Sequence, residues 1–155
     1  MSPTNDIAPI SDSFLNYQYQ ILGISPYLAR PDVTEICINQ PGSIFLESAK
    51  GWERVDVDTL TFERARHFCT TVVNASQTHQ RITATDPMVS LTYPSGQRAQ
   101  CVIPPAVEAG TVSITIRQPA QRSKTLAKYA EDGFFVHLLV EHDTKVIDKD
   151  VVNIL

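Results

Sequence analysis

Alternating apolar and polar positions predict that strands make up much of this chain. Three such segments, at residues 33–39, 43–47 and 52–57, are separated only by short turns that contain glycine. Short turns of this kind join antiparallel strands, so the three segments predict a meander. A second group of three strands follows at residues 88–93, 98–103 and 111–117.

Helical periodicity appears in three places. A helix is predicted with Ser11 or Asp12 as its cap and Leu22 near its end, a second from Thr61 to about residue 75, and a short third at residues 125–132. The apolar positions of the second recur at i, i+3, i+4 and i+7: Ala65, Phe68, Cys69 and Val72. The predicted fold class is therefore α+β, a largely antiparallel sheet of about six strands in two groups (meander plus hairpin), flanked by helices.

Composition is that of an ordinary globular chain. The 155 residues are 43% hydrophobic and 19% charged, which fits one domain with a single core. A net charge of -4 argues against a general nucleic-acid coat. Three cysteines without close spacing favour a reducing compartment, and no apolar stretch is long enough to cross a bilayer, so we expect a cytoplasmic protein.

The last two strands fix their own register. If their apolar residues share one face, a single antiparallel hairpin satisfies every pairing, because side chains alternate across a strand. The apolar face then pairs Ile103 with Val112, Cys101 with Ile114, and Ala99 with Ile116. The opposite face pairs Val102 with Ser113, Gln100 with Thr115, and Arg98 with Arg117.

Arg98 and Arg117 are thus expected side by side, where two like charges destabilise a sheet unless an anion compensates them. A carboxylate is one candidate, and it is the more usual partner of a surface arginine. A phosphate is the other, since the planar guanidinium can donate two hydrogen bonds to phosphate oxygens. The pattern alone favours the carboxylate and leaves both alternatives open.

An ordered set of motifs runs through these strands. They are Val33-Thr34-Glu35-Ile36-Cys37-Ile38-Asn39, Pro41-Gly42, Gly51-Trp52, Pro94-Ser95-Gly96-Gln97-Arg98-Ala99-Gln100, Pro104-Pro105 and Ser113-Ile114-Thr115-Ile116-Arg117-Gln118-Pro119, followed by Leu126, Tyr129 and Gly133-Phe134. The set resembles the N-terminal domain of the hexameric traffic ATPases of type IV secretion systems, within the type II/IV secretion system ATPase superfamily.

The resemblance implies a ring at the cytoplasmic face of the inner membrane that powers export or conjugative transfer of protein or DNA. It implies ATP as cofactor, bound between this domain and a RecA-like motor domain. Arg98 and Arg117 would reach the phosphates, and Asn39 would lie near the base. The implied partners are the domain's own motor, other copies in a homo-hexamer, and inner-membrane channel and coupling proteins, without direct nucleic-acid binding.

The phosphate-binding loop of such motors, Gly-x-x-x-x-Gly-Lys-Ser/Thr, occurs nowhere in this sequence. Without it, there is no amide cradle for the phosphates and no hydroxyl for Mg²⁺, so ATP hydrolysis by this chain alone is not expected. The resemblance predicts a flexible N-terminus at residues 1–10, the secretion-ATPase domain at 11–134, and a linker at 135–155 toward an absent motor that would also hold the Mg²⁺.

Other functions are also weighed. A stand-alone ligand-binding, sensor or protein-interaction module without ATPase activity fits the same fold, whereas an independent hydrolase has no supporting motif. His137, Glu141, His142 and Asp143 are ligand-type residues, but a solvated surface is favoured there over a metal site. His67 and Cys69 have no third group to orient them for nucleophilic catalysis.

Overall fold

The computed structural model describes residues 10–76, 80–119 and 125–134. The chain divides into two compact units, residues 1–120 and residues 121–155. The described strands all lie in the first unit, and each unit is described by itself below.

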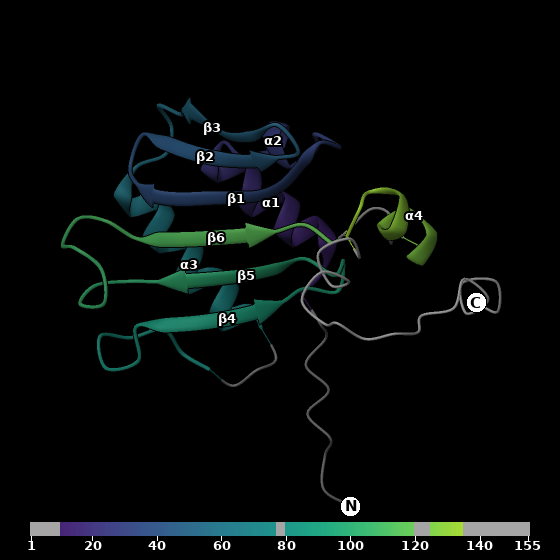
Figure 1. The fold of residues 1–155 in the computed structure, drawn as a ribbon. Coiled ribbons are helices and arrows are strands. Elements are labelled where there is room, and N and C mark those ends of the chain that lie inside the picture. The colour runs from purple at the N-terminus through teal and green to yellow at the C-terminus, as the bar shows by residue number, and fades with distance from the viewer. Residues whose placement is uncertain (1–9, 77–79, 120–124, 135–155) are drawn as a thin grey trace, which may run out of the picture. The chain divides into compact units, whose positions relative to one another are not determined.

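Six antiparallel strands of the first unit form one open sheet in the order β3-β2-β1-β6-β5-β4 (Figure 1). Their bounds are β1 Val33–Gln40, β2 Ser43–Ser48, β3 Gly51–Asp56, β4 Met88–Thr92, β5 Arg98–Val102 and β6 Ser113–Arg117. The α+β class and both predicted groups of strands are confirmed. The two groups join into a single sheet because β1 pairs with β6, which places Ile36 opposite Ile116 and Ile38 opposite Ile114.

Three helices belong to the first unit: α1 Asp12–Leu22, α2 Ser25–Leu28 and α3 Phe62–Ala75. The hydroxyl of Ser11 caps α1 by accepting a hydrogen bond from Phe14 N at 3.2 Å, and the hydroxyl of Thr61 caps α3 in the same way. Gly23 ends α1 with φ of 76°, a left-handed conformation that glycine adopts without steric cost. The one-turn helix α2 was not predicted.

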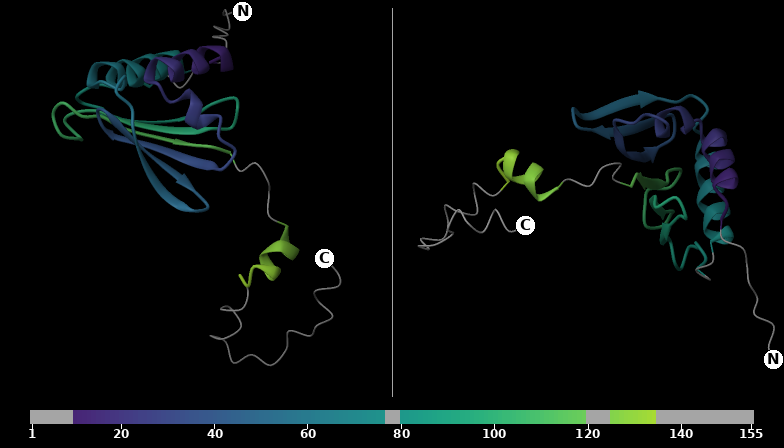
Figure 2. Two further views of the ribbon diagram at one scale, coloured as in Figure 1. Left: turned by 90° about the horizontal axis from the view of Figure 1, so that it is seen from above. Right: turned by 90° about the vertical axis from the view of Figure 1, so that its right-hand side faces the viewer.

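Helices α1 and α3 lie against the same face of the sheet (Figure 2). The core fills the space between them, and Phe68, Cys69 and Val72 of α3 are at most 1% exposed, as the periodicity predicted. The strands contribute the facing apolar side chains, among them Ile36, Ile38, Ile44, Leu46, Ile114 and Ile116. Because side chains alternate along a strand, the polar positions of the strands point to the opposite face, which no described element of this unit covers.

The β3 edge of the sheet carries paired charges. Arg30, which precedes β1, donates to Asp32 at 2.9 Å and to Glu53 of β3 at 3.1 Å. On β3 itself, Arg54 lies 3.1 Å from Asp56. Every arginine at this edge therefore has a carboxylate partner.

The second unit contributes one described helix, α4, Leu126–Glu131. Thr125 caps it by accepting from Lys128 N at 3.2 Å, and Gly133 follows with a positive φ, so the short helix predicted at residues 125–132 is confirmed. The predicted linker at 135–155 lies outside the described residues. Within the described ranges, no helix is both long and apolar enough to span a bilayer.

Candidate functional site

The β5–β6 hairpin has the register that its apolar pattern predicted. Pairs join Arg98 to Arg117, Ala99 to Ile116, Gln100 to Thr115, Cys101 to Ile114, and Val102 to Ser113. The sixth predicted pair, Ile103 with Val112, lies just beyond the strand ends, and both side chains are 2% exposed. Alternation buries the apolar partners beneath the helices and places both arginines on the uncovered face.

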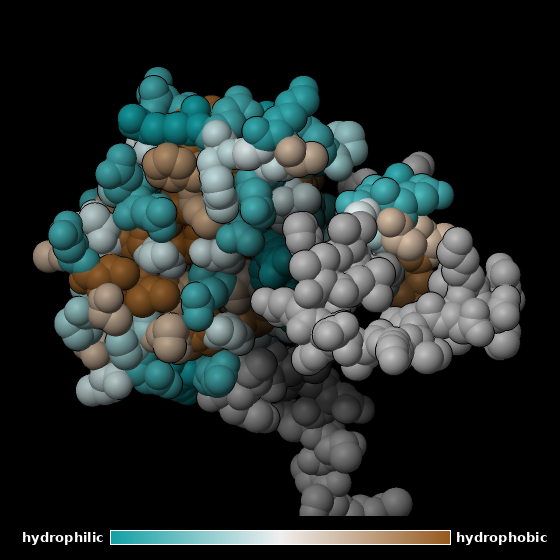
Figure 3. Space-filling view, viewed as in Figure 1, coloured by the Kyte–Doolittle hydropathy of each residue, from teal (hydrophilic) through white to brown (hydrophobic). Residues whose placement is uncertain are grey.

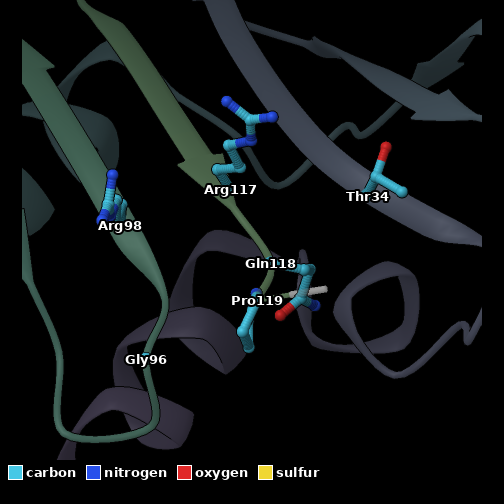
Figure 4. Close-up of a pocket in the computed structure, with 6 residues that line it drawn as sticks. All are labelled: Thr34, Gly96, Arg98, Arg117, Gln118 and Pro119. Carbon is cyan, nitrogen blue, oxygen red and sulfur yellow. The ribbon is translucent and has the colours of Figure 1, made fainter. Parts of the chain in front are cut away.

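The two arginines line an open pocket of about 410 Å³ at the end of the hairpin where β6 ends (Figure 4). Thr34, Gly96, Gln118 and Pro119 complete its lining. The pocket thus draws on β1, the turn before β5, β5 itself, β6 and the segment after β6. Its volume lies within the range of small-ligand sites.

Those four additional lining residues were not predicted as site residues from the sequence. Gln118 and Pro119 follow Arg117, and Gly96 lies two positions before Arg98; these three and Thr34 all belong to the motifs that carried the resemblance. Thr34 enters only because β1 pairs with β6, as the hydrogen bond from Gln118 N to Thr34 O at 2.8 Å shows. Proximity in sequence to the arginines was therefore the available signal for Gly96, Gln118 and Pro119, whereas Thr34 is distant in sequence from both arginines.

Neither guanidinium of the pair is compensated within the described part of the chain. No carboxylate oxygen lies within 4.0 Å of either one, and no hydrogen bond from either side chain is found there. Glu35 stands opposite Arg117 in the β1–β6 register. Its Oε1 instead lies 3.4 Å from Cys37 Sγ. The carboxylate partner that the pattern favoured is not formed, so that expectation is wrong for the described residues.

Charges along this row of the sheet are segregated by sign. The register relates Trp52, Glu47, Glu35, Arg117, Arg98 and Thr92, one from each strand in order across the sheet. Two carboxylates occupy the β2–β1 side of the row and two guanidiniums the β6–β5 side. Hydrophilic side chains also dominate the uncovered face where β6 ends, whereas hydrophobic ones gather at the opposite ends of β5 and β6 (Figure 3). The β6–β5 half of the row therefore carries a local positive charge on a chain of net charge -4.

Asn39, the third residue that the resemblance selected, lies outside the pocket lining. It is exposed on β1, and its Oδ1 accepts a hydrogen bond from Ser113 Oγ at 3.3 Å. Four residues separate it from Glu35, which places it about 13 Å along β1 from the arginine row. Asn39 and the arginines occupy the same sheet face but are not brought together.

The remaining chemical candidates do not form a site within the described ranges. His67 is exposed, and its Nε2 lies 3.3 Å from Thr71 Oγ1. Cys69 is buried, and its pKa is raised far above the usual thiol value by the neighbouring Cys101 thiol and by burial, so it holds its proton. No group of three or more metal-ligating side chains occurs in these ranges, and the cluster at His137, Glu141, His142 and Asp143 lies outside them.

Comparison with known proteins identifies relatives for most of the chain, although no family model matches it. The type IV secretion system protein VirB11 of Brucella suis biovar 1 is 41% identical over 115 residues, 74% of this chain. The type IV secretion system protein PtlH of Bordetella pertussis is 36% identical over 128 residues, 83% of this chain. The chain spans about a third of these relatives, 31% of the first and 37% of the second.

A solved structure agrees in fold. The crystal structure of the VirB11 ATPase from the Brucella suis type IV secretion system, in complex with sulphate, superposes with a TM-score of 0.71 at 37% sequence identity. The match covers 87% of this chain and 40% of the ATPase. Sequence and fold thus point to the same relatives, and the resemblance inferred from the ordered motifs is confirmed.

Proposed function

We propose, on the premise that this chain is homologous to the type IV secretion ATPases and corresponds to their N-terminal domain, that it contacts the nucleotide of such an ATPase. In this proposal Arg98 and Arg117 reach the phosphates of ATP. The phosphate-binding loop belongs to a RecA-like motor domain. The domain assembles as a homo-hexamer at the cytoplasmic face of the inner membrane and works with channel and coupling proteins to power export or conjugative transfer.

One observation carries the proposal: two guanidiniums stand side by side on an uncovered sheet face with no carboxylate within 4.0 Å among the described residues. Adjacent like charges cost free energy in a sheet, so the pairing of the two arginines destabilises the sheet unless an anion compensates it. A polyphosphate would remove that cost and accept paired hydrogen bonds from both guanidiniums. Sulphate, bound in the related ATPase, is an oxyanion of the same tetrahedral shape as a terminal phosphate.

This chain would contribute binding and charge, not the whole reaction. The guanidiniums donate hydrogen bonds and stabilise negative charge on the transferring phosphoryl group, a role that arginines fill in phosphoryl transfer. Mg²⁺ and the amide cradle would come from the motor, because the sequence has no phosphate-binding loop. Asn39 as a contact to the base stays a prediction, since it lies apart from the arginine pocket.

A second candidate is a stand-alone module that binds a small anion without any motor. It is favoured by one feature, namely that six residues of this chain alone line the 410 Å³ pocket. Such a module needs both arginines but gains nothing from Asn39. ATP and inorganic tripolyphosphate therefore discriminate the two candidates, because only the nucleotide domain has reason to bind ATP more tightly.

Titration calorimetry of this chain with tripolyphosphate tests the arginine assignment. Arg117→Ala is expected to weaken binding by about tenfold or more, because a charge-assisted hydrogen bond contributes about 1.5–3 kcal/mol. Arg54→Ala is the matched control, since Arg54 is also an exposed strand arginine but is paired with Asp56. Equal affinity of the Arg117→Ala variant and the unaltered chain would show that the pair does not bind phosphate.

A further inference from the structure

We propose that Gln97 and Gln118 are positioning residues that hold the arginine pair in place through a hydrogen-bonded chain between α1 and α2. Each glutamine is the direct chain neighbour of one arginine, Gln97 before Arg98 and Gln118 after Arg117. The inference rests on the proposed phosphate-binding role of those arginines. It assigns to these two residues a task other than contacting the anion.

The chain of hydrogen bonds is continuous. Tyr19 of α1 donates its hydroxyl proton to Gln97 Oε1 at 2.9 Å. Gln97 Nε2 donates to Gln118 Oε1 at 2.7 Å, and Gln118 Nε2 donates to the carbonyl of Leu28 in α2 at 2.8 Å. Residues separated by up to 90 positions in sequence are thereby joined across the end of the hairpin.

The donor-to-acceptor direction of these linked hydrogen bonds is fixed at the end where Leu28 lies. A backbone carbonyl can only accept, so Gln118 must present its amide nitrogen to Leu28 and its oxygen to Gln97. Gln97 must then present nitrogen to Gln118 and oxygen to Tyr19, which has to donate. Tyr19 is 3% exposed, and burial raises its pKa above the usual phenol value, so it keeps the proton that it donates. Each amide therefore has a single satisfied orientation.

The geometry links these bonds to the arginines. Gln97 directly precedes β5 and Gln118 directly follows β6, and both are half-buried and bonded to the helices, whereas the arginines beside them are exposed at the pocket. Gln118 is also held through its backbone, whose N–H donates to Thr34 O at 2.8 Å. A Cβ added at Gly96 would lie 3.5 Å from Pro119 Cβ, so the turn before β5 and the segment after β6 are in close approach.

Gln118 lines the pocket, and both polar atoms of its side chain are engaged elsewhere. Its Oε1 accepts from Gln97, and its Nε2 uses one of its two N–H groups to donate to Leu28 O, so the amide is anchored in one orientation. Its effect on anion binding would pass through the backbone of Arg117. This separates the glutamines from Arg98 and Arg117, whose side chains have no partner within the described residues.

The test compares Gln118→Met with Gln100→Met in tripolyphosphate titrations followed through the Nε–Hε NMR signals of the two arginines. Methionine keeps the length of glutamine but offers no amide. Gln100 lies on β5 outside the pocket lining, and the one hydrogen bond of its side chain among the described residues runs from Nε2 to Met88 Sδ, at 3.5 Å. We expect Gln118→Met to weaken binding about three- to tenfold and to broaden or shift the Arg117 signal in the free chain, with Gln100→Met unchanged.

A purely structural role predicts a different result. Gln118→Met would then lower the urea midpoint without changing the affinity of the folded chain, and that outcome overturns the inference. A double variant with Gln97→Met should lose less affinity than the two single losses added together, because the bond between the two residues is lost in both single variants. If Gln118→Met does not fold, Tyr19→Phe is the second variant, because it removes only the terminal hydroxyl. We expect it to lower the affinity for tripolyphosphate two- to threefold. Unchanged affinity in that variant would overturn the proposed role of the linked hydrogen bonds.

The outcomes also separate this inference from the proposed function. If the unaltered chain binds tripolyphosphate and Arg98→Ala abolishes binding while Gln118→Met does not change it, only the positioning role falls. If the unaltered chain does not bind tripolyphosphate, the phosphate role of the arginines falls, and the positioning role falls with it.

Discussion

Arginines near the β3 edge differ from those of the β5–β6 hairpin in what they contact. Arg30 and Arg54 are held by carboxylates at 2.9–3.1 Å, whereas Arg98 and Arg117 have none within 4.0 Å in the described ranges. All four belong to one sheet or its border. Surface arginines are thus paired with carboxylates where they tie segments of the fold together, and they lack such partners at the pair that we propose binds phosphate.

Arg30 illustrates the structural case. It bridges Asp32 and Glu53, and so ties the segment before β1 to the edge strand β3. Exposed ion pairs of this kind contribute little each, so their value lies mainly in local geometry. Arg98 and Arg117, by contrast, oppose the fold slightly, and they lie at the pocket that the proposed function uses.

The largest expected effect comes from reversing one charge of the unpaired pair. Arg98→Glu would place a carboxylate opposite Arg117, giving that arginine the kind of partner that Arg54 already has. Tripolyphosphate affinity should then fall by about a hundredfold or more, because one attraction is lost and one repulsion is added. Calorimetric titration measures the loss, with Arg54→Glu as the matched control. A similar loss of affinity in both variants would show that the paired and unpaired arginines do not differ in phosphate binding.

A medium effect is expected on stability, with opposite signs in the two regions. Arg30→Ala should lower the free energy of unfolding slightly, since its carboxylate partners lose their counter-charge. Arg98→Ala should leave that free energy unchanged or raise it by a few tenths of a kcal/mol, because a like-charge pair is removed. Urea unfolding of both variants measures the difference, and a clear destabilisation by Arg98→Ala would point to an unrecognised structural role.

The smallest expected effect is on the stability of the fold at acidic pH. Hydrogen bonding from Arg30 lowers the pKa of Asp32 below its usual value of 3.8. A carboxyl whose pKa is lowered by folding stabilises the native state above its unfolded-state pKa, and that contribution disappears as the pH falls through the folded-state value. The melting-temperature difference between the unaltered chain and Arg30→Ala should therefore shrink between about pH 5 and pH 2. A difference that stays constant over this range would exclude the Arg30–Asp32 contact as its source.

Much of the fold could be predicted because its signals are local. Thr61 begins α3 and the stripe from Ala65 to Val72 is buried, both as predicted, since capping and helical periodicity depend on near neighbours. The register of Arg98 with Arg117 followed from alternation within two short segments. The pairing of β1 with β6 could not be predicted in this way, because strands distant in sequence leave no local pattern of their partner.

The sequence by itself determined the elements, the hairpin register and therefore the adjacency of Arg98 and Arg117. Only the tertiary structure decided that Glu35, although opposite Arg117, forms no ion pair with it, and that Gln97 and Gln118 join Tyr19 to Leu28 beneath the pair. The physical reason is range. Alternation and capping act over a few residues, whereas the counter-charges and hydrogen-bond partners of a side chain come from whichever distant segments the packed sheet brings beside it.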